Sequence, residues 1–439
     1  MSTIYAPATA PGQAGIAVVR VSGPEAGTVL DRLAGGRPVP RQAVVRWLNI
    51  DDEPLDLALV LWFPAPASFT GEDVVELHLH GGRAVVAAVL DALSRLPGLR
   101  PAEAGAFTHR AFDHGKLDLT AVEGLADLVA AETEAQRRLA LRQSGGALAR
   151  LYDDWRERLL TATAMIEAAI DFPDEDLPAS LIVQVHHKMK QVREKIQQHL
   201  ADGHRGERLR EGLHLAIVGA PNVGKSSLLN RLARREAAIV SRHPGTTRDV
   251  IDVALDLGGY PVTIADTAGL RESGDEIEAE GVRRALARAE AADLKLAVFA
   301  ATTWPDGDRE TRAMLGADTL VVVNKIDLCL GLGRLDAHGS TVWPISCLTG
   351  AGIDALVAEI GRRAEAAMDP GLSLMLSRAR HRLALDDCVV ALGRGLDAPS
   401  PEFLAEDLRL AIRALGRITG RVDVEDVLDR IFAEFCIGK

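Results

Sequence analysis

The sequence is poor in cysteine, and it lacks any long apolar run. Its four cysteines, Cys329, Cys347, Cys388 and Cys436, show no CxxC pairing, which argues against a zinc site and against a secreted disulfide framework. No apolar stretch approaches the ~20 residues that are needed to span a bilayer. The N-terminus lacks the basic segment and apolar core of a signal peptide. We therefore expect a cytoplasmic protein that does not associate with a membrane.

Positive charge is also in the minority. The chain has 50 Lys and Arg residues against 62 Asp and Glu residues, which gives a formal net charge of −12 at pH 7. This balance argues against a surface that is basic throughout, but it does not exclude a local basic patch that holds RNA. The hydrophobic fraction of 47% is typical of globular proteins, and 439 residues are enough for about two to four domains.

The pattern of apolar and polar residues changes three times along the chain. Residues 1–117 contain short β-branched runs bounded by glycine and proline, whereas 118–212 show apolar residues at helical spacing and end in a predicted linker, "DGHRGERLREG". Residues 213–368 alternate short apolar runs with helical stretches, which predicts a doubly wound, mostly parallel sheet. Apolar residues at helical spacing return over 369–439. We expect a multidomain fold, with an N-terminal α+β domain and a helical domain into which an α/β domain is inserted.

A phosphate-binding loop is predicted at 219–227, "GAPNVGKSS". It follows the apolar run "LHLAIV" and opens a helical run, and Gly219, Gly224, Lys225 and Ser226 have the spacing of a P-loop. Glycines let backbone N–H groups turn toward a phosphate, and the helix N-terminus adds its dipole. The lysine would reach the β- and γ-phosphates, and the serine hydroxyl would bind Mg²⁺.

Two switch motifs follow in the expected order. "GTTRD" at 245–249 fits switch I, with Thr247 as the second hydroxyl ligand of Mg²⁺. "DTAG" at 266–269 follows a predicted strand, so that Asp266 would hold Mg²⁺ through water and the Gly269 N–H would sense the γ-phosphate.

Two further motifs indicate the base. In "NKID", the Asp327 carboxylate can accept hydrogen bonds from N1 and N2 of guanine, which adenine does not offer, while Asn324 would contact the base and the stem of Lys325 would cover it. Ser346 in "SCLTG" would border the base. The ordered motifs together predict a domain that binds and hydrolyses GTP.

The residue after the switch II glycine is Leu270, where many GTPases carry the glutamine that orients the attacking water. Catalytic help must therefore come from elsewhere. The Asn222 side chain could ligate a monovalent cation that acts as an arginine finger, and Arg248 and Arg271 are alternatives. The residues alone do not choose among the switch II carboxylates, which are Glu272, Asp275, Glu276, Glu278 and Glu280.

The chain resembles, over essentially its whole length, the MnmE (TrmE) family of tRNA-modification GTPases in the TrmE–Era–EngA superfamily. The stretches that carry the resemblance include "GIAVVRVSGP", "SFTGEDVVELHLHGG", "FTHRAFDHGKLDLTAVEGLADL", "GAPNVGKSSLLNRL", "DTAGLRESGDEIEAEG" and the terminal "FCIGK". Many unrelated enzymes share the P-loop. The terminal "CIGK" together with an inserted GTPase domain is specific to this family.

The resemblance implies a homodimer formed through domain 1–117, which would bind a tetrahydrofolate derivative (5-formyl- or 5,10-methylene-) as one-carbon donor. It also implies a FAD-dependent partner, MnmG, in a heterotetramer that adds an aminomethyl or carboxymethylaminomethyl group to carbon 5 of the wobble uridine of certain tRNAs. The remaining domains would be 118–212 and 369–439, which are helical, and 213–368, the GTPase domain. The folate contacts would be Arg20, Glu76, Lys116 and Lys439.

The resemblance also assigns residues around the nucleotide. Glu278 would arrange the water network, and K⁺ would be held by Asn222, Ser241, His243 and Thr246. Ser241 and His243 stand where the family often has Thr and an aliphatic residue, but backbone carbonyls can ligate K⁺ whatever the side chain. The full nucleotide-binding set is Asn222, Val223, Gly224, Lys225, Ser226, Ser227, Ser241, Thr246, Thr247, Asp266, Thr267, Ala268, Gly269, Asn324, Lys325, Asp327 and Ser346.

The C-terminal tail, "EFCIGK", follows a run that predicts an amphipathic helix. The apolar side of this helix would anchor the tail, and Cys436 would then lie near the one-carbon chemistry as a nucleophile or proton donor. The alternative is that the thiol is a small buried hydrophobe. The residues of the predicted apolar side are Val427, Leu428, Ile431, Phe432 and Phe435.

Two other functions compete with this interpretation. A ribosome-assembly GTPase of the Era/EngA type would share the P-loop asparagine and the "DTAGL" switch, but the chain has neither an RNA-binding C-terminal domain nor tandem GTPase domains of that type. A non-enzymatic folate-binding scaffold related to glycine-cleavage proteins would resemble only 1–117, and the complete GTPase motifs argue against it.

Overall fold

The computed structural model describes residues 2–172, 181–234, 238–239, 253–265, 290–305, 308–329, 341–369, 371, 374–422, 428, 431–432, 435 and 438. The chain divides into two compact units. The first comprises Met1–Ala126, Arg142–Val192 and Val390–Lys439, and the second comprises Asp127–Leu141 and Arg193–Val389. These units do not test the predicted domain bounds, which stay a prediction.

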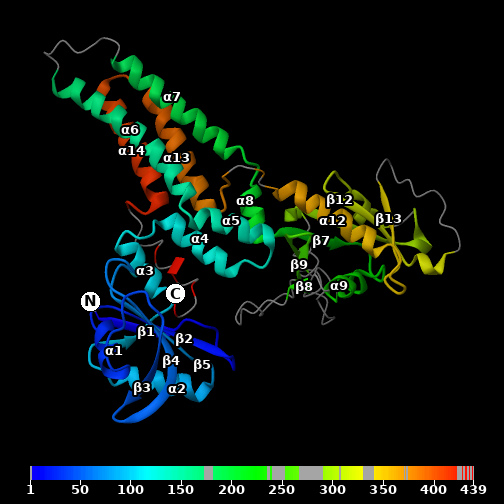
Figure 1. Cartoon of the computed structure of the whole chain (residues 1–439). Coiled ribbons are helices and arrows are strands. Elements are labelled where there is room, and N and C mark those ends of the chain that lie inside the picture. Colours follow the sequence, from blue (N-terminus) through cyan, green and yellow to red (C-terminus); the bar gives the residue numbers. More distant parts are fainter. Residues whose placement is uncertain are drawn as a thin grey trace, which may run out of the picture. The chain divides into compact units, whose positions relative to one another are not determined.

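The first unit contains a six-stranded sheet in the order β3-β4-β5-β2-β1-β6. Neighbouring strands are antiparallel except for β1 and β6, which are parallel. Helices α1 (Ala26–Leu33) and α2 (Arg83–Ser94) pack on this sheet (Figure 1), so the predicted α+β domain is confirmed. The strands are β1 (Thr3–Pro7), β2 (Ile16–Ser22), β3 (Val44–Ile50), β4 (Glu53–Phe63), β5 (Val74–His80) and β6 (Leu99–Pro101).

The two faces of this sheet differ in burial. Side chains alternate between the faces of a strand, and one face, which includes Val19, Val60 and Leu77, forms a buried core with α1 and α2. The other face carries Arg20 and Glu76, which stand opposite each other in the register of β2 and β5. The same face remains largely exposed at Ile16 and Trp47.

Most of the remaining described residues of the first unit are helical. α6 (Ala147–Asp171) and α14 (Pro401–Thr419) pack along each other although they lie far apart in the sequence (Figure 1). This confirms the helical domain built from two separate chain segments. The other helices that lie wholly or partly in this unit are α3 (Ala106–Asp113), α4 (Leu119–Ala130), α5 (Glu134–Ser144), α7 (Leu181–Leu200) and α13 (Ala379–Leu396).

The second unit is built on a seven-stranded sheet in the order β13-β12-β11-β7-β10-β9-β8. Strands β13, β12, β11, β7 and β10 are parallel to one another. Strands β9 and β8 continue the sheet as an antiparallel edge. Both faces of the central strands are buried, which confirms the predicted doubly wound sheet. The strands are β7 (Leu213–Val218), β8 (Ala238–Ile239), β9 (Val253–Leu257), β10 (Tyr260–Ala265), β11 (Leu294–Ala300), β12 (Thr319–Asn324) and β13 (Val342–Pro344).

Within the described residues, the short helices between these strands are α9 (Lys225–Ala233), η1 (Ala301–Thr303), α11 (Arg309–Ala313) and η2 (Ile326–Leu328). The 16-residue helix α12 (Ile353–Met368) follows β13. Among the described residues, no helix is both long and apolar enough to cross a membrane.

The prediction of a linker over 202–212 was wrong, because Arg205–Glu211 forms helix α8. Within this charged stretch, Leu209 is completely buried in the core of the second unit. Arg208 Nε donates a hydrogen bond to Asp293 Oδ1 at 2.6 Å, and Arg210 Nε donates to Asp127 Oδ1 at 3.1 Å. Tertiary ion pairs and one buried leucine therefore stabilise a helix that its own sequence does not indicate.

Candidate functional site

The predicted phosphate-binding loop joins β7 to α9. Asn222 and Gly224 have positive φ angles of 61° and 102°, which curl the loop before the helix begins. Lys225 Nζ donates hydrogen bonds to the carbonyls of Gly219 at 2.8 Å and Ala220 at 3.0 Å. Partial burial lowers the pKa of Lys225. An ammonium group inside a loop at a helix N-terminus suits a phosphate ligand.

The Asn324 side chain ties three loops together. At the end of β12 it is buried, and its Nδ2 donates to the Val223 carbonyl at 2.9 Å. Its Oδ1 accepts a hydrogen bond from Cys347 N at 3.1 Å. A β-carbon on Gly224 would lie 2.2 Å from Asn324 Nδ2, so glycine is required there for this close approach. The structure thus gives the amide group a bridging role, whereas its predicted contact with the base stays a prediction.

The residues predicted to recognise the base lie beside this bridge. Lys325 Nζ donates to the carbonyl of Asn222 at 2.5 Å, which places its stem next to the phosphate-binding loop. Ser346 Oγ donates to Asp327 Oδ1 at 2.5 Å and accepts from Thr349 N at 3.1 Å. An exposed carboxylate held in this way can accept hydrogen bonds from the edge of a purine ring.

The described residues contain only part of the predicted site. Asn222, Val223, Gly224, Lys225, Ser226 and Ser227 lie in the loop and the first turn of α9, next to Asn324 and Lys325. The other predicted ligands of Mg²⁺ and K⁺, the switch residues and the tail residues lie outside the described residues. These are Ser241, His243, Thr246, Thr247, Asp266, Thr267, Ala268, Gly269, Glu278, Cys436 and Lys439.

A second predicted cluster lies on the exposed face of the N-terminal sheet. Arg20 Nε and Nη2 donate to Glu76 Oε1 at 3.1 and 2.9 Å, and Arg20 Nη1 approaches the Gly438 carbonyl at 3.5 Å. The Arg20 guanidinium carbon lies 5.5 and 5.8 Å from the ring centres of Phe69 and Phe107. The contact with Gly438 brings the tail beside Arg20, which was predicted together with Lys439 to contact folate.

The loop that contains Phe69 also approaches Lys116. A β-carbon on Gly71 would lie 3.5 Å from Lys116 Cε, and Lys116 is exposed. Three of the four predicted folate contacts, Arg20, Glu76 and Lys116, therefore lie around one loop. A carboxylate, two cations and the exposed ring of Phe69 have the chemistry to hold a ring with amide-type donors and an anionic tail.

The sequence reasoning missed the residues that fix this loop. Arg110 is buried, and its Nη1 donates to Glu72 Oε2 at 2.6 Å and to the Ser22 carbonyl at 3.0 Å. Ser22 Oγ also donates to Glu72 Oε2 at 2.9 Å and lies 2.8 Å from Thr70 Oγ1. Only the presence of Glu72 and Arg110 inside the two quoted N-terminal stretches could have indicated them.

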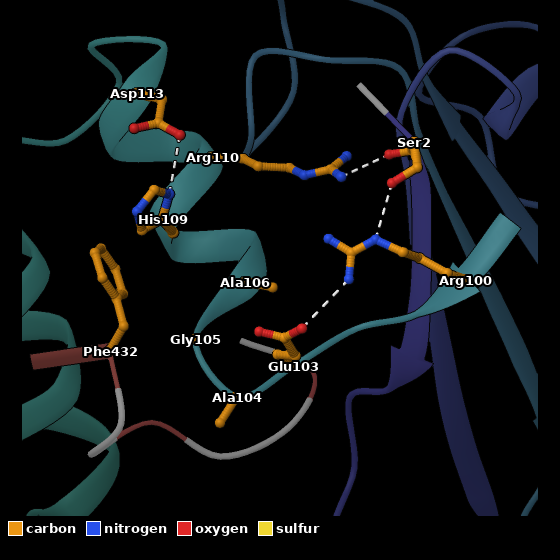
Figure 2. A pocket seen from close by; sticks show the side chains of 10 residues that line it. All are labelled: Ser2, Arg100, Glu103, Ala104, Gly105, Ala106, His109, Arg110, Asp113 and Phe432. Atoms are coloured by element: carbon orange, nitrogen blue, oxygen red, sulfur yellow. Dashed lines mark hydrogen bonds and ion pairs between the residues drawn. The ribbon is translucent and has the colours of Figure 1, made fainter. Parts of the chain in front are cut away.

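A cavity of about 730 Å³ lies beside α3. Figure 2 shows Arg100 and Arg110 both reaching Ser2, His109 paired with Asp113, and Phe432 next to His109. Arg20, Glu76 and Lys116, the predicted folate contacts that the structure describes, are not among the residues that line it. Ile431, Phe432 and Phe435 are buried against α4, as the amphipathic pattern predicts.

Comparisons with known proteins cover the whole chain. The family profile described as "MnmE helical domain" matches residues 119–436, and "GTP-binding protein TrmE N-terminus" matches residues 3–116. Proteins named tRNA modification GTPase MnmE from Rhodospirillum rubrum and Paramagnetospirillum magneticum are 57% and 56% identical, over 100% of this chain and 100% and 99% of their own. A crystal structure of Era with MgGDPNP and a 16S ribosomal RNA fragment is 28% identical over 43% of this chain and 69% of that chain, with a TM-score of 0.29.

Proposed function

The chain belongs to the MnmE family of tRNA modification GTPases, and on that premise we propose that it uses GTP hydrolysis to drive modification of carbon 5 of the wobble uridine in certain tRNAs. The observation that carries the proposal is the identity above 50% over the full length of both chains. This match favours MnmE over the Era/EngA alternative, because it includes the N-terminal and helical domains as well as the GTPase domain.

The phosphate-binding loop supports GTP and Mg²⁺ binding. Lys225, which now donates to two loop carbonyls, would instead donate to the β- and γ-phosphates. Ser226 and Thr247 would bind Mg²⁺, and Asp327 would select guanine. Bound Mg²⁺ neutralises charge that develops on the transferred phosphoryl group.

We propose that K⁺ stimulates hydrolysis. The chain lacks the switch glutamine, and Asn222 stands in the phosphate-binding loop with a positive φ angle. Asn222, Ser241, His243 and Thr246 would hold the cation, and Glu278 would orient water. GTP turnover should be faster in K⁺ than in Na⁺ at equal ionic strength, and Asn222→Ala should lose that difference. Equal rates in the two salts for the wild type would contradict the proposal.

The partly buried cluster around Arg20 supports folate binding. Glu76 offers a carboxylate to ring N–H groups, Phe69 offers an exposed flat surface, and Lys116 and Lys439 would attract an anionic tail. A bound tetrahydrofolate derivative supplies the one-carbon unit. The contact between Arg20 and Gly438 supports a tail that ends at this cluster, with Cys436 as nucleophile or proton donor.

The partners belong to the same proposal. The exposed sheet face supports a homodimer through the N-terminal domain. A FAD-dependent MnmG subunit would complete a heterotetramer that transfers the aminomethyl or carboxymethylaminomethyl group. Because its substrate is tRNA, we place the protein in the cytoplasm.

The test is mass spectrometry of tRNA from a strain in which the gene is deleted and then restored. Modified wobble uridines should disappear on deletion and return with the wild-type gene. Cys436→Ser should fail to restore them while GTP turnover stays near wild type. Unchanged wobble uridines in the deletion strain would overturn the proposed function.

A further inference from the structure

Helix α7 carries a larger net positive charge than the other described helices of the helical domain. It carries four cations, Lys188, Lys190, Arg193 and Lys195, and a single carboxylate, Glu194. The neighbouring long helices α6 and α14 carry at least as many carboxylates as cations. The contrast is sharper because the whole chain has a net charge of −12.

The buried side of α7 is apolar throughout. Val185, Met189, Val192 and Ile196 are fully buried, and they recur at the spacing of one helical face. Met189 reaches Gly395 of α13, where an added β-carbon would lie 2.9 Å from its terminal carbon. Figure 1 shows α7 as a long green helix beside α13. This side of the helix is therefore occupied by the protein itself.

The opposite side is an exposed polar ridge, and the cations flank it. At 100° per residue, Lys190 and Arg193 fall on one flank of the ridge, and Lys188 and Lys195 fall on the other. Lys190 and Lys195 are exposed, and the other two are partly exposed. The ridge itself consists of His187, Gln191, Glu194 and Gln198, all exposed.

These cations are not used in ion pairs within the described part of the chain. Exposed arginines elsewhere pair within one helical turn, as Arg158 does with Asp154 and Arg362 with Glu359. No such pair forms between Lys190 and Glu194, although they are four residues apart, nor for the other α7 cations among the described residues. No described carboxylate neutralises their positive charge, which can therefore act on an external anion.

We propose that the outer face of α7 binds the phosphate backbone of tRNA, an inference that rests on the proposed function. Residues 188 and 195 are about 10 Å apart along the helix axis, so cations on both flanks can reach successive phosphates of a strand laid along the ridge. Lysine ammonium groups are point charges, and backbone contacts of this kind position a nucleic acid without reading its sequence. Between His187 and Gln198 the ridge has no apolar centre, which a protein interface would need.

The test compares how tightly the wild type and three variants bind an unmodified tRNA transcript with uridine at the wobble position. The first combines Lys188→Gln, Lys190→Gln and Lys195→Gln. The matched control, Arg137→Gln with Arg158→Gln and Arg362→Gln, removes the same total charge from exposed arginines that are already paired. The third is Glu194→Gln, which removes the only carboxylate of α7.

If all three lysines contact phosphates, the wild type should lose about 20–40-fold more affinity than the lysine variant between about 50 and 200 mM salt, because each contact contributes roughly 0.7–0.9 to the log–log salt slope. The control should keep the wild-type slope, and Glu194→Gln should bind more tightly. All variants should keep the wild-type melting temperature and GTP turnover.

Equal salt slopes for the lysine variant and the control would overturn the proposal while the proposed function stands. Unchanged tRNA affinity with lost wobble modification would also overturn it, since the face would then serve a protein partner. If the wild type neither binds nor modifies tRNA, the proposed function fails first, and the inference fails with it.

Discussion

At the scale of single residues, the most consequential side chain in the nucleotide site is Asn324. Asn324 belongs to the "NKID" motif, which was predicted to recognise the base. In the structure, however, both ends of its amide group form hydrogen bonds within the protein, with the Val223 carbonyl and the Cys347 N–H. The phosphate-binding loop and the loop that borders the base therefore depend on one buried residue.

Replacing Asn324 should loosen both loops at once. Asn324→Ala leaves the Val223 carbonyl and the Cys347 N–H without partners, which costs about 1–3 kcal/mol each when such groups stay buried. Asn324→Asp keeps the acceptor for Cys347 but sets a carboxylate against the Val223 carbonyl. Affinity for a fluorescent GTP analogue should fall at least roughly tenfold in both variants, whereas the exposed Asn49→Ala should bind normally. Wild-type affinity in Asn324→Ala would show that the bridge is dispensable.

The Arg20 fork offers a second test at this scale. Arg20→Lys keeps the charge but loses the pair of N–H groups that meet Glu76 Oε1, and it loses the reach to Gly438. Affinity for 5-formyltetrahydrofolate, measured by calorimetry, should fall roughly tenfold or more, with normal GTP turnover. The control is Arg37→Lys, because Arg37 Nε and Nη2 meet one oxygen of Asp31 at the same distances, 3.1 and 2.9 Å. A similar loss in both variants would point to unfolding rather than to lost recognition.

At the scale of elements, the end of α7 meets α8 and α13 through a cluster of charges. Arg382 Nη2 donates to Asp202 Oδ1 at 2.7 Å, its Nε donates to Glu207 Oε1 at 3.2 Å, and its Nη1 donates to the Leu200 carbonyl at 2.9 Å. His199 lies beside this cluster. Burial lowers the pKa of His199 to about 4, although nearby Asp202 raises it in part.

This histidine should make folding sensitive to acid. In the unfolded chain it takes up a proton below pH ~6.5, whereas in the folded chain it stays neutral down to about pH 4. The stabilisation is therefore present above pH ~6.5 and is lost as the pH falls toward 4, by up to roughly 3 kcal/mol. Melting temperatures measured between pH 7 and 4.5 should fall more steeply for the wild type than for His199→Gln. Parallel curves would show that His199 carries none of the acid sensitivity.

At the scale of the whole molecule, the exposed face of the N-terminal sheet carries the apolar surface through which we propose that the chain dimerises. Trp47 and Val45 on β3 are 59% and 60% exposed, and Leu57, paired with Trp47, is 40% exposed. A tryptophan on a strand at the edge of a sheet is costly to leave in water unless a partner covers it.

Charge on that face should separate the subunits. Trp47→Lys with Val45→Lys places like charges against each other across a two-fold interface, so dimer affinity should fall at least roughly 100-fold. Light scattering after gel filtration should find a wild-type dimer and a variant monomer. Phe403→Lys, at a residue of α14 that is 63% exposed, serves as the control and should stay dimeric. A dimeric lysine variant would place the interface elsewhere.

The sequence by itself determined the fold class, the order of the GTPase motifs and the family. These features depend on local patterns: apolar runs of strand length, helical spacing, and glycine, lysine and serine at the intervals that a phosphate requires. Burial of the apolar side chains Ile431, Phe432 and Phe435 also followed from a local pattern, the amphipathic spacing of the last helical run.

Only the tertiary structure decided how these motifs meet. The Asn324 amide reaches a carbonyl 101 residues away, Arg110 reaches Glu72 across 38 residues, and the Gly438 carbonyl lies beside Arg20. Helix α8 forms in a charged stretch because its one leucine and its arginines find partners in distant segments. The periodicity of a sequence reports which face of an element is apolar, but it does not report which distant residue that face or its polar neighbours will touch. For that reason the bridge at Asn324, and the α7 cations that have no ion pair among the described residues, were visible only in the folded chain.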